Sequence, residues 1–145
     1  MDVQLREPKT EEDFQLYYDL RWRILREPWT RARESAQDEH EDDAFHIMAF
    51  EEGAFLVGVG RLHFNTPEEA QVRYMAVENG HTRSGIGSLI LEALEAHARQ
   101  QGAKRIVLNA RQDAIPFYTR HNYGLIDKTS ILFESLVHWQ MRKNL

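Results

Sequence analysis

Two glycines separated by one residue stand where a polar turn gives way to a helical pattern, in HTRSGIGSLILEAL at residues 81–94. Gly85 and Gly87 have no side chains, so another group can approach the backbone closely. The amides and dipole of a helix N-terminus favour an anion, and Arg83 adds positive charge. The spacing is typical of a phosphate-binding loop, although glycines that only permit a turn give the same short pattern.

The residues around Gly87 discriminate among phosphate ligands. A nucleoside-triphosphate loop requires a lysine followed by serine or threonine, whereas Ser88 and Leu89 follow here. A dinucleotide fingerprint requires a third glycine where Ile90 stands, and an acidic residue where Asn109 ends the next strand. The triphosphate loop is therefore excluded and a nucleotide-dependent oxidoreductase is disfavoured, which leaves a pyrophosphate held by backbone amides.

The segment TRSGIG resembles the acetyl-CoA-binding motif of the GNAT N-acetyltransferase superfamily, Arg/Gln-x-x-Gly-x-Gly/Ala, with Thr82 in place of Arg/Gln. RYMAVENGHTRSGIGSLILEALEAHARQQG is similar to the family's strand, loop and helix, and IVLNARQDAIPFYTRHNYG to its next strand and helix. LRWRILREPW and HWQM are similar to small bacterial members, such as the ElaA-like branch. The resemblance covers most of the chain, most specifically residues 73–124, and Thr82 leaves the strength of CoA binding open.

The resemblance implies an α+β (mixed α/β) fold, the GNAT-like acyl-CoA N-acyltransferase fold, as one domain over residues 1–145. Its central, mixed, mostly antiparallel twisted sheet is flanked by helices. The implied reaction transfers an acetyl group from acetyl-CoA, the acyl-donor cosubstrate, to an unidentified primary amine by direct attack in a ternary complex, without a metal. The alternative is a CoA-binding sensor or interaction module without turnover.

By the same resemblance, backbone amides of the glycine loop hold the pyrophosphate of CoA, and the preceding strand pairs with the pantetheine arm. Asn109 ends the neighbouring strand, where it either contacts pantetheine or bonds to its own turn. The implied cofactor-binding residues are Met75, Ala76, Val77, Arg83, Ser84, Gly85, Ile86, Gly87, Ser88 and Asn109.

Tyr118 matches the tyrosine whose hydroxyl protonates the departing thiolate in the family, although a packed tyrosine would give the same pattern. The candidates for the base that deprotonates the amine are His63, His138 and Glu78. Histidine has an ordinary pKa near neutrality, but a single histidine on a strand is more often a packing or surface residue.

The elements that must position these residues begin with a short strand over residues 3–5. Thr10 and the acidic residues after it predict a helix that ends at Pro28. The charged run at 31–43 predicts an exposed loop or a mobile helix. AFHIMAFEEGAFLVGVGRLHF predicts two strands joined by a Glu-Gly turn, and AQVRYMAV predicts a third.

A helix is expected from about residue 86 to 101, followed by Gly102 as its stop. Its expected inward face consists of Ile86, Leu89, Ile90, Ala93, Leu94, His97 and Ala98. KRIVLNA predicts a central strand, Asp113 is expected to cap a short helix in AIPFYTRH, and GLIDKTSIL and LVHWQMRK predict two closing strands. This order predicts helices packed around one sheet.

The 145 residues carry a net charge of -5 and no cysteine. The charge argues against a nucleic-acid binder, and the missing cysteine excludes disulfides and thiol nucleophiles. The start MDVQLREPKTEED is too polar for a signal peptide, and no apolar run approaches the roughly 20 residues that cross a bilayer. We therefore expect a cytoplasmic monomer or homodimer without nucleic-acid or membrane partners.

HEDDAFH at residues 40–46 combines histidines with carboxylates, but its spacing matches no standard metal site. We expect a solvated acidic loop and no bound metal. If this loop lines the acceptor cleft, its negative charge would suit a cationic amine.

Overall fold

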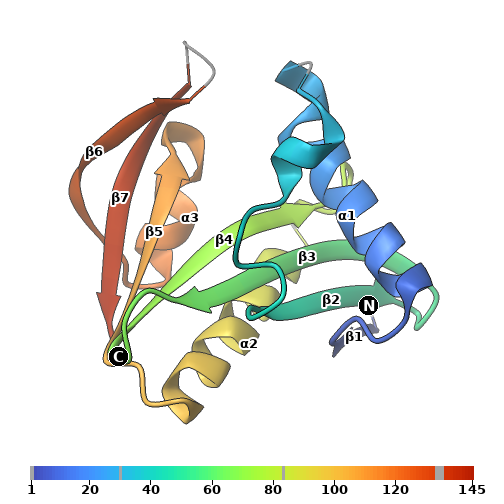
Figure 1. Cartoon of the computed structure of the whole chain (residues 1–145), viewed down its shortest axis with the longest axis horizontal. Coiled ribbons are helices and arrows are strands. Elements are labelled where there is room, and N and C mark those ends of the chain that lie inside the picture. The colour runs from blue at the N-terminus through green and yellow to red at the C-terminus, as the bar shows by residue number, and fades with distance from the viewer. Residues whose placement is uncertain (1, 30, 83, 133–135) are drawn as a thin grey trace.

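The computed structural model describes residues 2–29, 31–82, 84–132 and 136–145. Its described residues form a seven-stranded sheet with three α-helices packed around it (Figure 1). The strands are β1 (Val3–Arg6), β2 (Phe45–Glu51), β3 (Phe55–Phe64), β4 (Glu69–Val77), β5 (Arg105–Arg111), β6 (Gly124–Leu132) and β7 (Leu136–Asn144). The helices are α1 (Glu11–Leu25), α2 (Ile86–Gln100) and α3 (Ile115–Arg120), with short 3₁₀ helices η1 (Glu27–Trp29), η2 (Arg33–Ala36) and η3 (Gln112–Ala114).

The sheet has the strand order β1-β2-β3-β4-β5-β7-β6, and all its pairs are antiparallel except β4 with β5. The expected mixed, mostly antiparallel sheet flanked by helices is therefore confirmed. None of the helices among the described residues combines the length and the apolar character that crossing a membrane requires.

The parallel pair β4–β5 joins two arms of the sheet over a short distance. Within the part of the chain that the structure describes, only Glu69–Gln71 of β4 pair with β5, and their partners are residues 105–107. Beyond them the strands diverge, so that β1 to β4 form one arm and β5 to β7 the other (Figure 1). Because neither strand pairs with the other past this point, the space between them can take a ligand.

The two faces of the sheet are covered by different helices. α2 packs on one face, where it contributes to the larger apolar core, and α1 packs on the other with the smaller one. α2 approaches β3 closely because Gly58 and Gly60 have no side chains: a Cβ at either position would lie 2.6 Å from an atom of Ile90. These two glycines therefore set the depth at which α2 sits on the sheet.

A β-bulge in β4 changes which face its side chains point to. Tyr74 and Met75 together oppose Gly60, because the register shifts by one residue between the pairs Val59–Ala76 and Arg61–Arg73. Tyr74 has φ 58°, a left-handed conformation that is strained for a bulky residue. As a result, Val72 and Met75 both pack in the core under α2, although two residues rather than one lie between them.

Most predicted elements are confirmed, and the start of α1 was predictable because it carries a capping box. Thr10 accepts a hydrogen bond from the amide of Asp13, whose side chain bonds back to the cap backbone. The predicted cap at Asp113 is wrong: α3 begins after η3 without a side-chain cap. The predicted inward face of α2 is also partly wrong, since Leu89 is 39% exposed while Leu91 is buried.

Candidate active site

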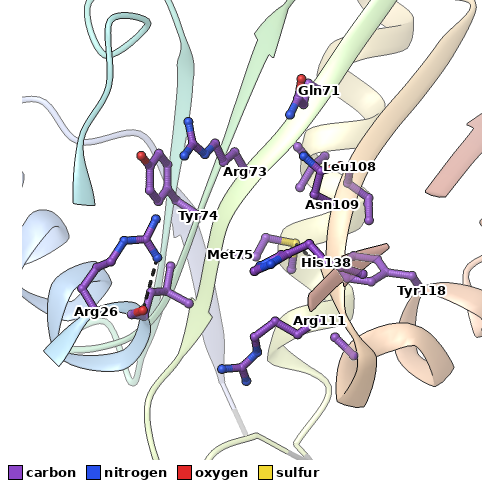
Figure 2. A pocket seen from close by; sticks show the side chains of 14 residues that line it. Arg26, Gln71, Arg73, Tyr74, Met75, Leu108, Asn109, Arg111, Tyr118 and His138 are labelled. Atoms are coloured by element: carbon purple, nitrogen blue, oxygen red, sulfur yellow. Dashed lines mark hydrogen bonds between the residues drawn. The ribbon is translucent and has the colours of Figure 1, made fainter. Parts of the chain in front are cut away.

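A cleft of about 420 Å³ opens where β4 and β5 diverge (Figure 2). Both strands, the end of α1, α3 and β7 contribute to its lining. The lining residues are Leu25, Arg26, Gln71, Val72, Arg73, Tyr74, Met75, Leu108, Asn109, Ala110, Arg111, Ala114, Tyr118 and His138.

The cleft has an apolar side toward α2 and α3. Met75 and Tyr118 pack against the core beneath α2, which also contains Leu108 and Ala110. This side is built by alternate residues of β5, since every second side chain of a strand points to the same face.

The opposite side of the cleft, toward α1, is polar. Alternation places Asn109 and Arg111 on this face, and His138 lies directly opposite Arg111 in the β5–β7 register. From the other arm, Arg73 and Tyr74 point the same way as a consequence of the bulge (Figure 2). A ligand in the cleft would therefore meet apolar groups on one side and polar, cationic groups on the other.

Tyr118 stands on the apolar side, where its hydroxyl donates to Met75 Sδ at 3.7 Å. Burial raises the pKa of Tyr118 to about 12, and the charge of Arg111 opposes this only in part. The hydroxyl therefore keeps its proton at neutral pH and is a proton donor on this side of the cleft.

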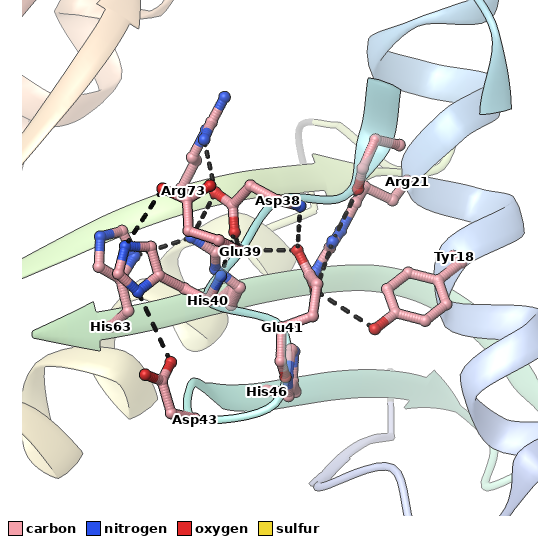
Figure 3. A network of polar contacts seen from close by, with 12 residues as sticks. Tyr18, Arg21, Asp38, Glu39, His40, Glu41, Asp43, His46, His63 and Arg73 are labelled. Carbon is pink, nitrogen blue, oxygen red and sulfur yellow. Dashed lines mark hydrogen bonds and ion pairs between the residues drawn. The ribbon is translucent and has the colours of Figure 1, made fainter. Parts of the chain in front are cut away.

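The three predicted base candidates lie in different surroundings, and only His138 lines the cleft with Tyr118. His63 is 5% exposed: Arg61 donates to its Nδ1 at 2.8 Å, and its Nε2 donates to Asn65. Burial, followed by the charge of Arg61, lowers the pKa of His63 to about 4. His63 therefore sits inside a polar network (Figure 3) and is not among the residues that line the cleft.

Glu78, just beyond β4, is engaged in an ion pair with α1. Both guanidinium nitrogens of Arg23 donate to its carboxylate, at 2.9 and 3.1 Å. These hydrogen bonds lower the pKa of Glu78 below its ordinary value, despite partial burial that raises it. A carboxylate held in this way is a weak base, and it is not among the residues that line the cleft.

The start of α2 presents backbone amides without a side-chain cap. Gly85 is the N-cap with φ 86°, and the first helical bond runs from the amide of Leu89 to its carbonyl. By helix geometry, the amides of Ile86, Gly87 and Ser88 have no partner within the helix. These three donors lie where the sequence predicts the anion.

Other predicted residues of this loop have internal contacts. The amide and the hydroxyl of Ser84 both donate to the carbonyl of His81, at 3.3 and 2.5 Å. A Cβ on Gly87 would lie 3.4 Å from the ring of Phe117, so α3 packs closely over the start of α2. Arg83, which was predicted to add a positive charge, lies outside the described residues.

The charged segment before β2 is only in part the solvated loop that its composition predicts, since Asp42 and Asp43 are exposed but two other carboxylates are not. Asp38 and Glu41 have side chains that are 9% and 10% exposed, and both form ion pairs with the fully buried Arg61 (Figure 3). Asp38 also pairs with Arg73, and Glu41 with Arg21. The prediction of an exposed acidic loop is therefore wrong for these two carboxylates.

A sequence signal for this network exists in β3. Arg61 stands between apolar residues in VGRLHF, at a strand position where alternation continues from Val59 into the sheet's covered face. A charge at such a position requires an ionic partner, and the acidic run before β2 can supply one. In the described residues, no group of three acidic or histidine side chains is placed to hold a metal ion.

The family model for the acetyltransferase (GNAT) family matches residues 14–123. The uncharacterized N-acetyltransferase YjcF of Bacillus subtilis is 29% identical over 136 residues, which span 94% of this chain and 96% of the relative.

Solved structures share the fold over almost the whole chain. A PaiA N-acetyltransferase from Thermoplasma acidophilum in complex with coenzyme A has a TM-score of 0.80 and 15% identity, and the match covers 100% of both chains. A GNAT family acetyltransferase from Elizabethkingia anophelis with acetyl-CoA bound has a TM-score of 0.81 and 14% identity, over 99% of this chain and 98% of the other. Because the family model spans most of the sequence, the chain belongs to the acetyltransferase (GNAT) family.

Proposed function

We propose that the protein transfers the acetyl group of acetyl-CoA to a primary amine, by direct attack of the amine on the thioester in a ternary complex. The observation that carries this proposal is the cleft between β4 and β5, with Tyr118 on one side of it. The uncapped start of α2 follows β4 along the chain and packs against α3. The coenzyme in the two structures of the same fold supports acetyl-CoA as the donor.

The pyrophosphate of the donor is held by the amides at 86–88, which the helix dipole makes favourable for an anion. Arg83 and the backbone of Ser84 and Gly85 complete this loop. The backbone of β4 from Met75 to Val77 pairs with the pantetheine arm as an added strand would, since the pairs with β5 end at Gln71. Asn109 lines the same cleft from β5.

Two side chains move protons in the proposed reaction. His138 takes a proton from the acceptor, whose nitrogen then bonds to the carbonyl carbon of the thioester. A backbone amide of β4 stabilises the charge on the carbonyl oxygen. The carbon–sulfur bond breaks, and Tyr118 gives its proton to the departing sulfur. The excess proton on the new amide nitrogen then passes to the Tyr118 oxygen and restores the hydroxyl. Burial keeps the hydroxyl of Tyr118 protonated at neutral pH, so its proton is in place when the thiolate forms.

Calorimetric titration with acetyl-CoA, NADH and ATP tests the choice of donor, and release of CoA in the presence of an amine panel tests turnover. We expect binding of acetyl-CoA alone among the three. Binding without turnover on any amine would support the alternative, a CoA-binding module without activity. Binding of NADH or ATP in preference to acetyl-CoA would refute the proposed function.

Tyr118→Phe tests the acid. We expect kcat to fall by roughly 10²-fold or more, the range for general acid–base catalysis, with the Kd for acetyl-CoA little changed. Tyr18→Phe is the matched control, because its hydroxyl bonds to Glu41 outside the cleft. An unchanged kcat in a folded Tyr118→Phe protein would remove Tyr118 from the mechanism.

His138→Gln tests the base in the same assay. The variant should lose the acidic limb of the kcat/KM profile against pH, since no group near neutrality then accepts the proton. His81→Gln is the control, because His81 lies outside the cleft and contacts Glu51. A pH profile that keeps its acidic limb would assign the base elsewhere.

A further inference from the structure

The charged side chains that line the cleft are all basic. Among the described lining residues there are three arginines, one histidine and no aspartate or glutamate. The three arginines are Arg26, Arg73 and Arg111. They reach the cleft from α1, β4 and β5, so positive charge surrounds it on more than one side (Figure 2).

The carboxylates behind the cleft do not neutralise this charge. Arg73 pairs with Asp38, but Asp38 also receives both terminal nitrogens of the buried Arg61. Glu41 is shared in the same way between Arg61 and Arg21. In this described network, three guanidinium groups therefore face two carboxylates, which leaves one positive charge in excess.

Arg111 lies on the other arm and has a weaker neighbour. It contacts Asp113 at 3.4 Å, and the side chain of Asp113 is 73% exposed and lies outside the cleft lining. An exposed pair of this kind is screened by water and contributes little. Arg111 brings its guanidinium group to the lining of the cleft from this second arm.

Four arginines surround the ring of Tyr74 on the α1 side of the sheet. Four guanidinium carbons lie 4.3–5.4 Å from the centre of its ring, those of Arg21, Arg26, Arg61 and Arg73. An aromatic face attracts cations but carries no net charge, so it gathers the arginines without cancelling their field. The ring lies on the α1 side of the sheet, where Arg21 and Arg26 contact it, and the backbone of Tyr74 has the left-handed conformation of the bulge.

This cationic side is separate from the loop that we assign to the pyrophosphate. Arg73, Asn109 and Arg111 point toward the α1 face, whereas α2 packs on the other face of the sheet. An anion attracted here would therefore belong to the second substrate.

We propose that the amine acceptor carries a carboxylate or phosphate group, which the arginines on the α1 side of the cleft bind. This deepens the proposed function and rests on it. It replaces the cationic acceptor expected from the acidic run at 40–46, because no described residue of that run lines the cleft and its Glu41 is committed to arginines. A polycationic acceptor would be repelled from a cleft with this lining.

The test compares amines that share the group bearing the amine and differ in charge. Phosphoethanolamine and β-alanine are compared with ethanolamine, L-leucine with L-leucinamide, and spermidine serves as the polycation. Release of CoA gives kcat/KM, and calorimetry on the complex with CoA gives Kd for each compound. We expect an anionic member to be preferred over its uncharged partner by about tenfold or more, as for one charge-assisted hydrogen bond. The comparison of phosphoethanolamine with β-alanine identifies whether the phosphate or the carboxylate is bound.

Arg73→Gln and Arg111→Gln should each reduce this preference by about tenfold, mainly through KM. Arg33→Gln removes the same charge outside the cleft, where Arg33 pairs with Asp19, and should keep the preference. Two cleft variants are used because one of them could disturb folding. The Kd for acetyl-CoA shows separately whether the donor site is intact.

The inference is overturned if spermidine or the uncharged partners are preferred, if no anionic member binds the complex with CoA, or if both cleft variants keep the preference. Failure of acetyl-CoA to bind the wild-type protein would instead refute the proposed function, so the two failures are distinguishable.

Discussion

Replacing Gly58 by alanine should push α2 away from β3. The added Cβ would lie 2.6 Å from Ile90 Cδ1 and 2.9 Å from Ile86 Cγ2. Carbon atoms pack best about 3.5–4.0 Å apart, so about 1 Å of overlap must be relieved. Overpacking of this size costs about 1–3 kcal/mol of unfolding free energy.

Gly60→Ala is a matched control, because its Cβ would meet a different atom of the same isoleucine. That atom is Ile90 Cγ2, also at 2.6 Å. Ile90→Val removes Cδ1 and keeps Cγ2, at a cost of about 0.5–1.5 kcal/mol by itself. Ile90→Val should therefore reduce the loss of unfolding free energy caused by Gly58→Ala by about 1 kcal/mol. In the double variant with Gly60→Ala, the two losses of unfolding free energy should instead add within about 0.5 kcal/mol.

Equilibrium unfolding in urea measures both cycles, provided that the m value is unchanged. Gly58→Ala should also raise the Kd for acetyl-CoA more than Gly60→Ala, since Ile86 is the first residue of α2. Equal coupling energies in the two cycles would refute the reasoning, because they would show that these individual contacts do not set the position of α2.

Further predictions concern the buried network. Asp38→Asn should destabilise the protein by about 3–5 kcal/mol in urea unfolding, since it leaves the buried charge of Arg61 under-compensated, whereas the exposed Asp42→Asn should change stability by less than about 0.5 kcal/mol. Burial raises the pKa of Asp38, but hydrogen bonds from Arg61 and the backbone of His40 outweigh it and hold the pKa well below its usual range. The unfolded chain therefore binds the proton first, so stability should fall below about pH 4, and less steeply in Asp38→Asn. The pKa of His63 is lowered from 6.5 to about 4, so the unfolded chain binds this proton first and the protein should lose stability as the pH falls from about 6.5 to 4. His63→Asn should flatten the plot of melting temperature against pH over this range.

Sequence patterns predicted most helices and strands because interactions between residues close together in the chain determine where these elements begin and end. The cap at Thr10, the alternation in β2 and β3, and Gly102 with φ 93° each act within a few residues of chain. The glycine loop could be predicted for the same reason, since its donors are the backbone amides at the start of α2.

Features that depend on distant contacts could not be predicted. Asp38 and Glu41 look solvated in their own segment, and only the packing of that segment over β3 and β4 makes them partners of Arg61 and Arg73. The choice among His63, Glu78 and His138 likewise depends on where the two arms separate, which no local pattern records. The exposure of Leu89 depends on which surface of α2 the sheet covers.

The single extra residue at Tyr74 constrains how this strand can be redesigned. Before it, Ala70 and Val72 pack under α2, and after it Met75 and Val77 do so. If β4 lost the bulge but kept all its residues, strict alternation from Val72 onward would turn Met75 and Val77 toward α1. Grafts that aim at a new acceptor specificity can therefore change residue types in β4, but must keep the bulge and its left-handed residue at position 74.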